Sequence, residues 1–385
     1  MDLSEFFSIQ STLLAAVPRS ESRFHKKTID WNHRLIGIVG GRGTGKSTML
    51  LQHIAEHDTG DQQTLYLSAD HIHVQATGLY EIGSSFFRLG GKTFVIDEIH
   101  KYIDWRQEVK NLHDAFPETK IYFSGSSTLG LQRGKGDLSR RAVYYSLPGL
   151  SFREYLSFAH GLAFKPASLP DLLKNHAALA SRILKEGPIL GRFRDYLDHG
   201  VYPFFLEGVH LYHNKLSNVI EKVLYEDIPA ATATKTANVP AMKRMLWLIA
   251  TSQPFTPNIE KMARDLKISK PTIYTYLDFL ERAMLLSGFL PAETGYRLVR
   301  KPSKIYMENT NLLRQIAGEL GTREQIGTVR ETFFAHQLKS AGMSLSIPKY
   351  GDFQVDNNPL FEIGGKGKGG HQLKGLSNAD PKSVV

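Results

Sequence analysis

Gly40, Gly45, Lys46 and Ser47 have the residue types and the spacing of a phosphate-binding loop, G-x-x-x-x-G-K-[ST]. In such a loop the backbone N–H groups point inward at the positive end of a helix. The lysine reaches the β- and γ-phosphates, and the serine hydroxyl ligates Mg²⁺. The alternative is a glycine turn that matches by accident. With ATP and Mg²⁺ as the expected cofactors, the predicted nucleotide contacts are Gly40, Gly41, Arg42, Gly43, Thr44, Gly45, Lys46, Ser47 and Thr48.

The residues on either side of the loop have the pattern that such a site needs. Residues 35–39 are an apolar run that predicts a buried strand. Residues 47–56 place Met49, Leu50 and Ile54 at helical spacing. The order of strand, glycine loop and helix therefore favours phosphate binding over an accidental match.

A second apolar run, residues 94–96, ends in the acidic pair Asp97 and Glu98. Ligands bind at the carboxyl ends of strands in open α/β sheets. We expect Asp97 to hold Mg²⁺ together with Ser47, and Glu98 to polarise the attacking water, which indicates hydrolysis. An acidic pair after a strand also caps helices in many proteins, so capping is the alternative.

Two further segments offer groups for the same chemistry. Residues 120–128 predict a strand that ends in small hydroxyl residues, where Ser126 or Ser127 is placed to sense the γ-phosphate. Arg140 and Arg141 follow in a polar loop, from which they would neutralise transition-state charge, including in a neighbouring subunit. Turn-forming serines and a solvated basic loop are the alternatives.

The composition bounds the class of protein. The chain has 385 residues, 42% of them hydrophobic, and this length predicts two or three domains. It has no cysteine, which excludes disulfides and cysteine-based zinc sites. The net charge of +9 favours a polyanionic partner, although a merely basic surface explains it equally. The acidic start and the lack of a long apolar run predict a cytoplasmic protein without a membrane partner.

Several segments resemble a known family. GGRGTGKST, TLYLSAD, FVIDEIHKYIDW, YFSGSST and LPGLSFREYL are similar to segments of the prokaryotic AAA+-like P-loop ATPases with a C-terminal domain of uncharacterised function. The resemblance implies an α/β fold, in which a P-loop NTPase parallel sheet with a helical lid precedes a winged helix and a small α+β restriction-endonuclease-like module. It also places Arg141, rather than Arg140, at the family's arginine. An arginine acting in trans fits a homo-oligomer, for which a ring such as a hexamer is expected.

The fold that the resemblance implies divides the chain into four expected parts. Residues 1–150 would form the ATPase core and residues 151–235 the helical lid. Residues 236–310 would form the winged helix. Residues 311–385 would form the nuclease-like module, which we expect to be incomplete because its last residues do not have the pattern of a closing strand or helix.

The winged helix is predicted from two amphipathic helices joined by a short turn and followed by two β-rich runs. Thr256 with Pro257, and Ser269 with Pro271, are the expected helix starts. The second helix of such a domain can enter a DNA major groove, whereas protein contacts or packing on the ATPase lid are the alternatives. The expected DNA contacts are Lys270, Thr272, Tyr274, Arg282, Arg297, Arg300, Lys301 and Lys304.

The C-terminal segment has carboxylates that alternate with apolar residues across two short predicted strands, as in PD-(D/E)xK nucleases that bind Mg²⁺. Gly364 stands where such nucleases carry a lysine, so Lys366 or Lys368 would have to replace it. An active nuclease and an inactive DNA-binding or structural remnant are the alternatives. The candidate residues are Glu331, Asp352, Asp356, Glu362 and Lys366.

Three functions are consistent with these patterns. The first is an ATPase that binds DNA through the winged helix and couples ATP turnover to remodelling or processing such as branch migration or repair. The second is a nucleotide-dependent switch in signalling or defence, in which the winged helix serves autoinhibition or protein contacts. The third is an ATP-regulated, Mg²⁺-dependent nuclease.

Overall fold

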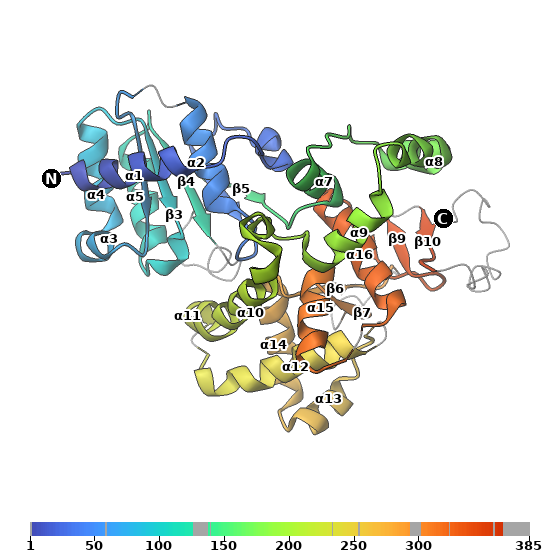
Figure 1. Cartoon of the computed structure of the whole chain (residues 1–385). Coiled ribbons are helices and arrows are strands. Elements are labelled where there is room, and N and C mark those ends of the chain that lie inside the picture. Colours follow the sequence, from blue (N-terminus) through green and yellow to red (C-terminus); the bar gives the residue numbers. More distant parts are fainter. Residues whose placement is uncertain are drawn as a thin grey trace. The chain divides into compact units, whose positions relative to one another are not determined.

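The structure is a computed structural model that describes residues 2–57, 60–125, 138, 140–232, 234–252, 255–292, 302–322, 324–356 and 359–364. The chain divides into two compact units, Met1–Pro148 and Gly149–Val385 (Figure 1). Within the described ranges, no helix has both the length and the apolar character needed to cross a membrane.

The first unit is built on a parallel sheet of five strands in the order β2-β3-β4-β1-β5, with helices on both faces (Figure 1). Neighbours in this order are not all neighbours in sequence. Strand β2 is the next strand after β1 along the chain, but β1 pairs with β4 and β5. The strands are β1 (Leu35–Val39), β2 (Thr64–Ser68), β3 (Thr93–Asp97), β4 (Lys120–Gly125) and β5 (Val143–Ser146). The helices are α1 (Ser4–Ala16), α2 (Lys46–His57), α3 (Ile72–Thr77), α4 (Leu79–Arg88) and α5 (Trp105–Ala115), with short 3-10 turns η1 (Phe24–Thr28) and η2 (Ile99–Lys101).

Alternate side chains of the strands feed two hydrophobic cores, one on each face of the sheet. Leu35 and Val39 of β1 lie in the cluster that includes residues of α4 and α5, whereas Ile36 and Ile38 lie in the cluster that includes residues of α2. Successive side chains of a strand point to opposite faces, so a strand covered on both sides needs apolar residues throughout. The buried strand predicted for residues 35–39 is confirmed.

Helix α1 protects the edge of the sheet formed by β2. Edge strands expose unpaired backbone groups that can pair with another chain. The side chain of Gln10 donates from Nε2 to the Thr64 carbonyl at 3.1 Å and accepts the Tyr66 N–H at 2.6 Å. Gln10 is itself buried. Its amide thus satisfies part of the β2 edge as a neighbouring strand would.

The second unit is mostly helical and ends in short antiparallel strands (Figure 1). Its helices are α7 (Phe152–His160), α8 (Leu169–Leu184), α9 (Ile189–His199), α10 (Tyr212–Lys222), α11 (Ile228–Thr232), α12 (Val239–Thr251), α13 (Ile259–Leu266), α14 (Lys270–Arg282), α15 (Thr310–Glu319) and α16 (Ile326–Ser340). Shorter helical segments are η3 (Pro203–Glu207), η4 (Val209–Leu211), the π-helix η5 (Val223–Asp227) and η6 (Thr236–Asn238). Its strands are β6 (Leu286–Phe289), β7 (Lys304–Met307), β8 (Leu345–Ser346), β9 (Phe353–Val355) and β10 (Leu360–Phe361).

The helix pair α13–α14 precedes the antiparallel hairpin β6–β7. Phe255, before α13, adds a bridge to Ile305 of β7, so the hairpin has a third short partner. The predicted start of α14 is confirmed, because the Ser269 side chain accepts the Thr272 N–H and a proline stands in the first turn. The predicted start of α13 at Thr256 is wrong. Asn258 caps that helix by accepting the Lys261 N–H, which satisfies a first-turn donor as Thr256 would have done two residues earlier.

Asn311 of α15 joins this helix to α9. It is fully buried, and its amide donates to the carbonyls of Tyr196 and Leu197 at 3.0 and 2.8 Å while its oxygen accepts the Val201 N–H at 2.8 Å. A buried amide that is satisfied on both sides fixes the chains it connects. Asn311 therefore holds the end of α9, where the helical carbonyls need partners.

Candidate nucleotide site

The predicted phosphate loop connects β1 to α2 at the carboxyl end of the sheet. Gly43 and Gly45 have φ of 80° and 89°, a region that side chains disfavour. A Cβ on Gly40 would lie 2.3 Å from the Leu147 carbonyl oxygen, so a side chain there would displace backbone. The predicted glycines thus stand where the loop needs them, and Ser47 and Thr48 lie in the first turn of α2.

Lys46 is buried against the loop that carries it. Its ammonium donates to the carbonyls of Gly40 and Gly41 at 3.1 and 2.8 Å, and the Thr44 hydroxyl donates to Gly41 at 2.9 Å. The residue is only 4% exposed. The ammonium is therefore held at the loop. A phosphate would replace these carbonyls as its acceptor, because a charged acceptor forms the stronger hydrogen bond. The loop geometry and this lysine fit a nucleoside triphosphate.

Asp97 ends β3 and lies beside β4. Its side chain accepts from the Tyr66 hydroxyl at 2.8 Å and from the Ser124 hydroxyl, and the residue is 4% exposed. Burial and the neighbouring Asp97 raise the pKa of Tyr66 well above its usual value, so this phenol stays protonated and donates. Two donors thus orient the carboxylate that we expect to bind Mg²⁺ with Ser47.

Glu98 follows Asp97 in a left-handed backbone conformation, with φ of 49°. Such a φ is uncommon for a residue with a side chain and occurs where surrounding structure enforces it. The Glu98 N–H lies 3.4 Å from the Ser124 oxygen, and its carboxylate lies 3.5 Å from His100 Nε2. Its side chain is 23% exposed, but the Oε2 atom is buried and has no hydrogen-bond partner among the described residues. Its role as a general base stays a prediction.

The sequence analysis missed two members of this network, Tyr66 and Ser124. The predicted phosphate sensor, Ser126, lies outside the described residues, and so does Ser127. Ser124 lies near the end of β4, where its hydroxyl contacts the Asp97 carboxylate at the end of β3 and the backbone N–H of Glu98. The signal for it was present, since a buried polar residue inside an apolar strand needs a hydrogen-bond partner. Which partner it has depends on the strand order.

Comparison with known proteins agrees with this geometry. Residues 32–156 match the protein-family model described as an AAA domain. This part of the chain is an AAA-type P-loop ATPase domain. Residues 190–323 match a family described as a domain of unknown function.

One curated relative is an uncharacterized protein of Methanocaldococcus jannaschii, which is 29% identical over 291 residues. The match covers 70% of this chain and 60% of that protein, so the chain spans less than two thirds of the relative. Similar solved structures include AMPPCP-bound DnaA from Aquifex aeolicus, with 14% identity, a TM-score of 0.30, and coverage of 73% of this chain and 89% of that one. Another is the S. cerevisiae Hsp104-ADP complex, with 16% identity, a TM-score of 0.27, and coverage of 74% and 40%. TM-scores this low establish neither a shared overall fold nor a shared function.

Arg141 lies at the amino-terminal ends of the strands, whereas the phosphate loop lies at their carboxyl ends. It precedes β5, whose first residue, Val143, pairs with Ile36 of β1, whereas the loop begins after Val39. At about 3.3 Å per residue, the backbone at Arg141 is roughly 15–20 Å from the start of the loop. Its guanidinium forms two hydrogen bonds with Asp114, at 2.9 and 3.1 Å, and these hold the pKa of Asp114 below its usual range. Arg141 therefore does not reach the phosphate loop of its own chain.

The same end of the sheet has a cavity of about 440 Å³ with a basic lining. Three arginines and two histidines face it, with Asp30 as an acidic neighbour. The lining residues are Asp30, Asn32, His33, Arg34, His113, Arg140 and Arg141.

The predicted DNA contacts on α14 differ in their surroundings. Lys270 pairs with Glu260 at 2.6 Å, and Arg282 pairs with Asp278 at 2.8 Å. Tyr274 is 40% exposed, and the Thr272 hydroxyl contacts Ser269. Arg297, Arg300 and Lys301 lie outside the described residues.

The structure does not assemble the predicted nuclease site. Lys304 of β7 lies between Glu331 and Asp352, at 3.7 and 3.3 Å, and Tyr306 donates to Glu331 at 2.6 Å. Asp356 instead accepts the Ser344 N–H beyond the far end of β9. Across the described residues, which include all four predicted carboxylates, no group of three acidic or histidine side chains could hold a metal ion.

The prediction of a four-carboxylate metal site is therefore wrong for these residues. Asp352 and Asp356 flank the same three-residue strand, so the extended backbone separates them by roughly 13 Å. Lys366 lies outside the described residues. Lys304 was predicted to contact DNA from the wing, but it forms a partly buried ion cluster with Glu331 and Asp352.

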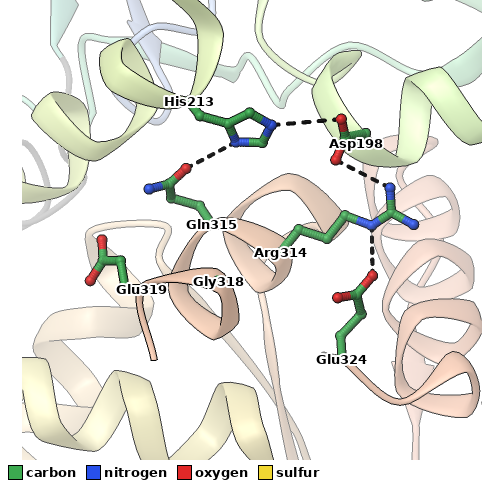
Figure 2. A pocket seen from close by; sticks show the side chains of 7 residues that line it. All are labelled: Asp198, His213, Arg314, Gln315, Gly318, Glu319 and Glu324. Atoms are coloured by element: carbon green, nitrogen blue, oxygen red, sulfur yellow. Dashed lines mark hydrogen bonds and ion pairs between the residues drawn. The ribbon is translucent and has the colours of Figure 1, made fainter. Parts of the chain in front are cut away.

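The second unit also contains a polar cavity of about 610 Å³ (Figure 2). His213 lies between Asp198 and Gln315, at 3.6 and 3.0 Å, and Arg314 lies between Asp198 and Glu324, at 3.3 and 2.9 Å. Hydrogen bonding with His199 and the nearby cations lower the pKa of Asp198 to about 2. The charged groups engage one another across α9, α10 and α15. These contacts connect the three helices.

Proposed function

We propose that this chain is an ATP-hydrolysing motor or remodeller that acts on DNA. The observation that carries the ATPase part is the placement of Asp97 and Glu98 at the same sheet edge as the glycine loop and Lys46. Ser47 and Asp97 would hold Mg²⁺, which neutralises phosphate charge when it is bound. Gly40 to Thr48 would cradle the phosphates, and Glu98 would accept a proton from the attacking water.

The DNA part of the proposal is supported by α13, α14 and the β6–β7 hairpin, the order of elements expected of a winged helix. Helix α14 begins at Lys270 and exposes Tyr274, so its first turns offer an aromatic ring and a cation that a DNA phosphate would have to take from Glu260. The chain carries a net charge of +9. Phosphate contacts from such cations position a protein on DNA.

The test is to measure ATP turnover with and without single-stranded, duplex and branched DNA, with the mass of the protein determined in the same buffers. We expect at least one DNA form to bind and to raise turnover severalfold, with weaker binding at higher salt because counterions are released. If DNA neither binds nor changes turnover, the DNA assignment fails. Slow turnover, retained nucleotide and a constant monomer mass would instead indicate the nucleotide-dependent switch.

Arg141 would act on the nucleotide of a neighbouring copy, because it lies too far from its own loop. We expect Arg141→Ala to lower ATP turnover by about 10³-fold, the lower range for arginines that stabilise phosphoryl-transfer charge. Arg140→Ala is the matched control, since Arg140 is the exposed neighbour in the same loop. Its turnover should stay within twofold of the parent, because a solvent-exposed charge contributes little.

Subunit mixing separates action in trans from a local defect. A chain with Arg141→Ala keeps its own phosphate loop, and a chain with Lys46→Ala keeps its arginine. Mixed together, the two inactive variants should regain turnover if one copy supplies Arg141 to the other. Full turnover by Arg141→Ala alone would contradict the assignment.

A further inference from the structure

Arg23 is a buried arginine that the sequence patterns did not single out. It lies directly before η1 and is 3% exposed. Its Nη1 donates to the Thr44 carbonyl and its Nη2 donates to the Pro148 carbonyl at 2.8 Å. A guanidinium has five N–H donors in a rigid plane, so it can bind two separate acceptors at once. Arg23 thus joins two segments that are 104 residues apart.

The first of these segments is the phosphate loop. Thr44 stands between the two left-handed glycines, Gly43 and Gly45, and is itself 3% exposed. Its hydroxyl and the Lys46 ammonium satisfy the carbonyls at the start of the loop. Arg23 satisfies the carbonyl of Thr44, at the centre of the loop.

The second segment is the end of β5. The Leu147 N–H donates to the Val39 carbonyl at 2.7 Å, and the Leu147 carbonyl stands where a Cβ on Gly40 would be. The chain therefore leaves the sheet in contact with the start of the phosphate loop. Pro148 is the last residue of the first unit, and the peptide bond after it leads into the second unit.

We propose that Arg23 is a positioning residue that couples the state of the phosphate loop to the chain segment entering the second unit. The inference rests on the proposed nucleotide-binding function. When phosphate draws Lys46 from the carbonyls of Gly40 and Gly41, the loop adjusts around its remaining contacts. Arg23 keeps Thr44 and Pro148 tied, so a shift of the loop is carried to the backbone at Pro148.

The experiment is amide hydrogen exchange of the full chain with and without a non-hydrolysable ATP analogue and Mg²⁺. The readout is the exchange rate at Leu147, Gly149 and Leu150, which flank Pro148. In the parent we expect nucleotide to change exchange there by about tenfold, as local openings shift with ligand. In Arg23→Lys, at nucleotide concentrations that saturate its own site, we expect less than about a twofold change. The guanidinium reaches the two carbonyls from two separate nitrogens, whereas lysine offers a single donor atom on a flexible stem.

Arg19→Lys is the control, since Arg19 is exposed in the same N-terminal segment, and it should behave as the parent. Arg23→Met, which keeps the apolar stem, tests the same loss without a misplaced charge, and thermal melts show whether each variant is folded. If Arg23→Lys responds to nucleotide as the parent does, the proposal is overturned. If the parent binds the analogue but shows no change at these amides, the coupling fails while the ATPase function stands. If the parent binds no nucleotide, the proposed function itself fails.

Discussion

Replacing Lys46 with alanine is expected to raise the Kd for ATP by about 100-fold. Lys46 is the residue of the loop motif whose positive charge interacts with the β- and γ-phosphates. A hydrogen bond to a charged group contributes about 3 kcal/mol at most, and each 1.4 kcal/mol is a tenfold change in affinity. The variant also removes donors from the carbonyls of Gly40 and Gly41, so the loop loses part of its support. Binding is measured by titration with a fluorescent ATP analogue.

The control for charge is Lys27→Ala, because Lys27 is exposed and lies in the same unit. Its affinity should match that of the parent. An unchanged melting temperature for Lys46→Ala would attribute the loss to the site rather than to unfolding. Parent-like affinity in folded Lys46→Ala would show that the loop does not bind phosphate through this lysine.

Replacing Glu98 with glutamine is expected to stop hydrolysis while leaving nucleotide binding intact. Glutamine has the same shape but cannot take up a proton, and loss of a general base costs about 10²–10⁴-fold in rate. Asp97, Tyr66 and Ser124 keep their contacts, so the expected metal site is preserved. The measurements are single-turnover hydrolysis and analogue affinity on the same protein.

Glu118→Gln is the matched control, since Glu118 is an exposed carboxylate after α5 at the other end of the strands. It removes the same charge from the same unit and should leave the rate unchanged. Turnover by Glu98→Gln equal to that of the parent would refute its assignment as base. A parallel loss of affinity would place Glu98 in nucleotide binding instead.

The ATPase half of the fold was predictable because its signals are local. The loop needs glycines at fixed offsets from Lys46, and β1 needs an apolar residue at each position because both of its faces are covered. Both requirements can be recognised in a run of consecutive residues. The match of residues 32–156 to an AAA domain agrees with that interpretation.

The second unit was less predictable because its signals are not local. Alternation suggested that Asp352 and Asp356 share a site, but they flank a strand and find different partners. The start of α13 was predicted two residues too early, because Thr256 and Asn258 are both residue types that cap helices well. Local propensity does not choose between them. Lys304 reads as a surface cation in sequence and is an ion-cluster member in the fold.

The sequence by itself determined the chemistry available at the nucleotide site, since Gly40 to Ser47 and the pair Asp97 and Glu98 are contiguous motifs whose geometry follows from short backbone segments. The tertiary structure alone decided which residues support that chemistry. Strand order placed Tyr66 and Ser124 on Asp97, and strand register placed Arg141 at the edge far from its own loop. Arg23 joins Thr44 to Pro148 for the same reason, because contacts between distant segments depend on how the strands are ordered and paired rather than on any local pattern.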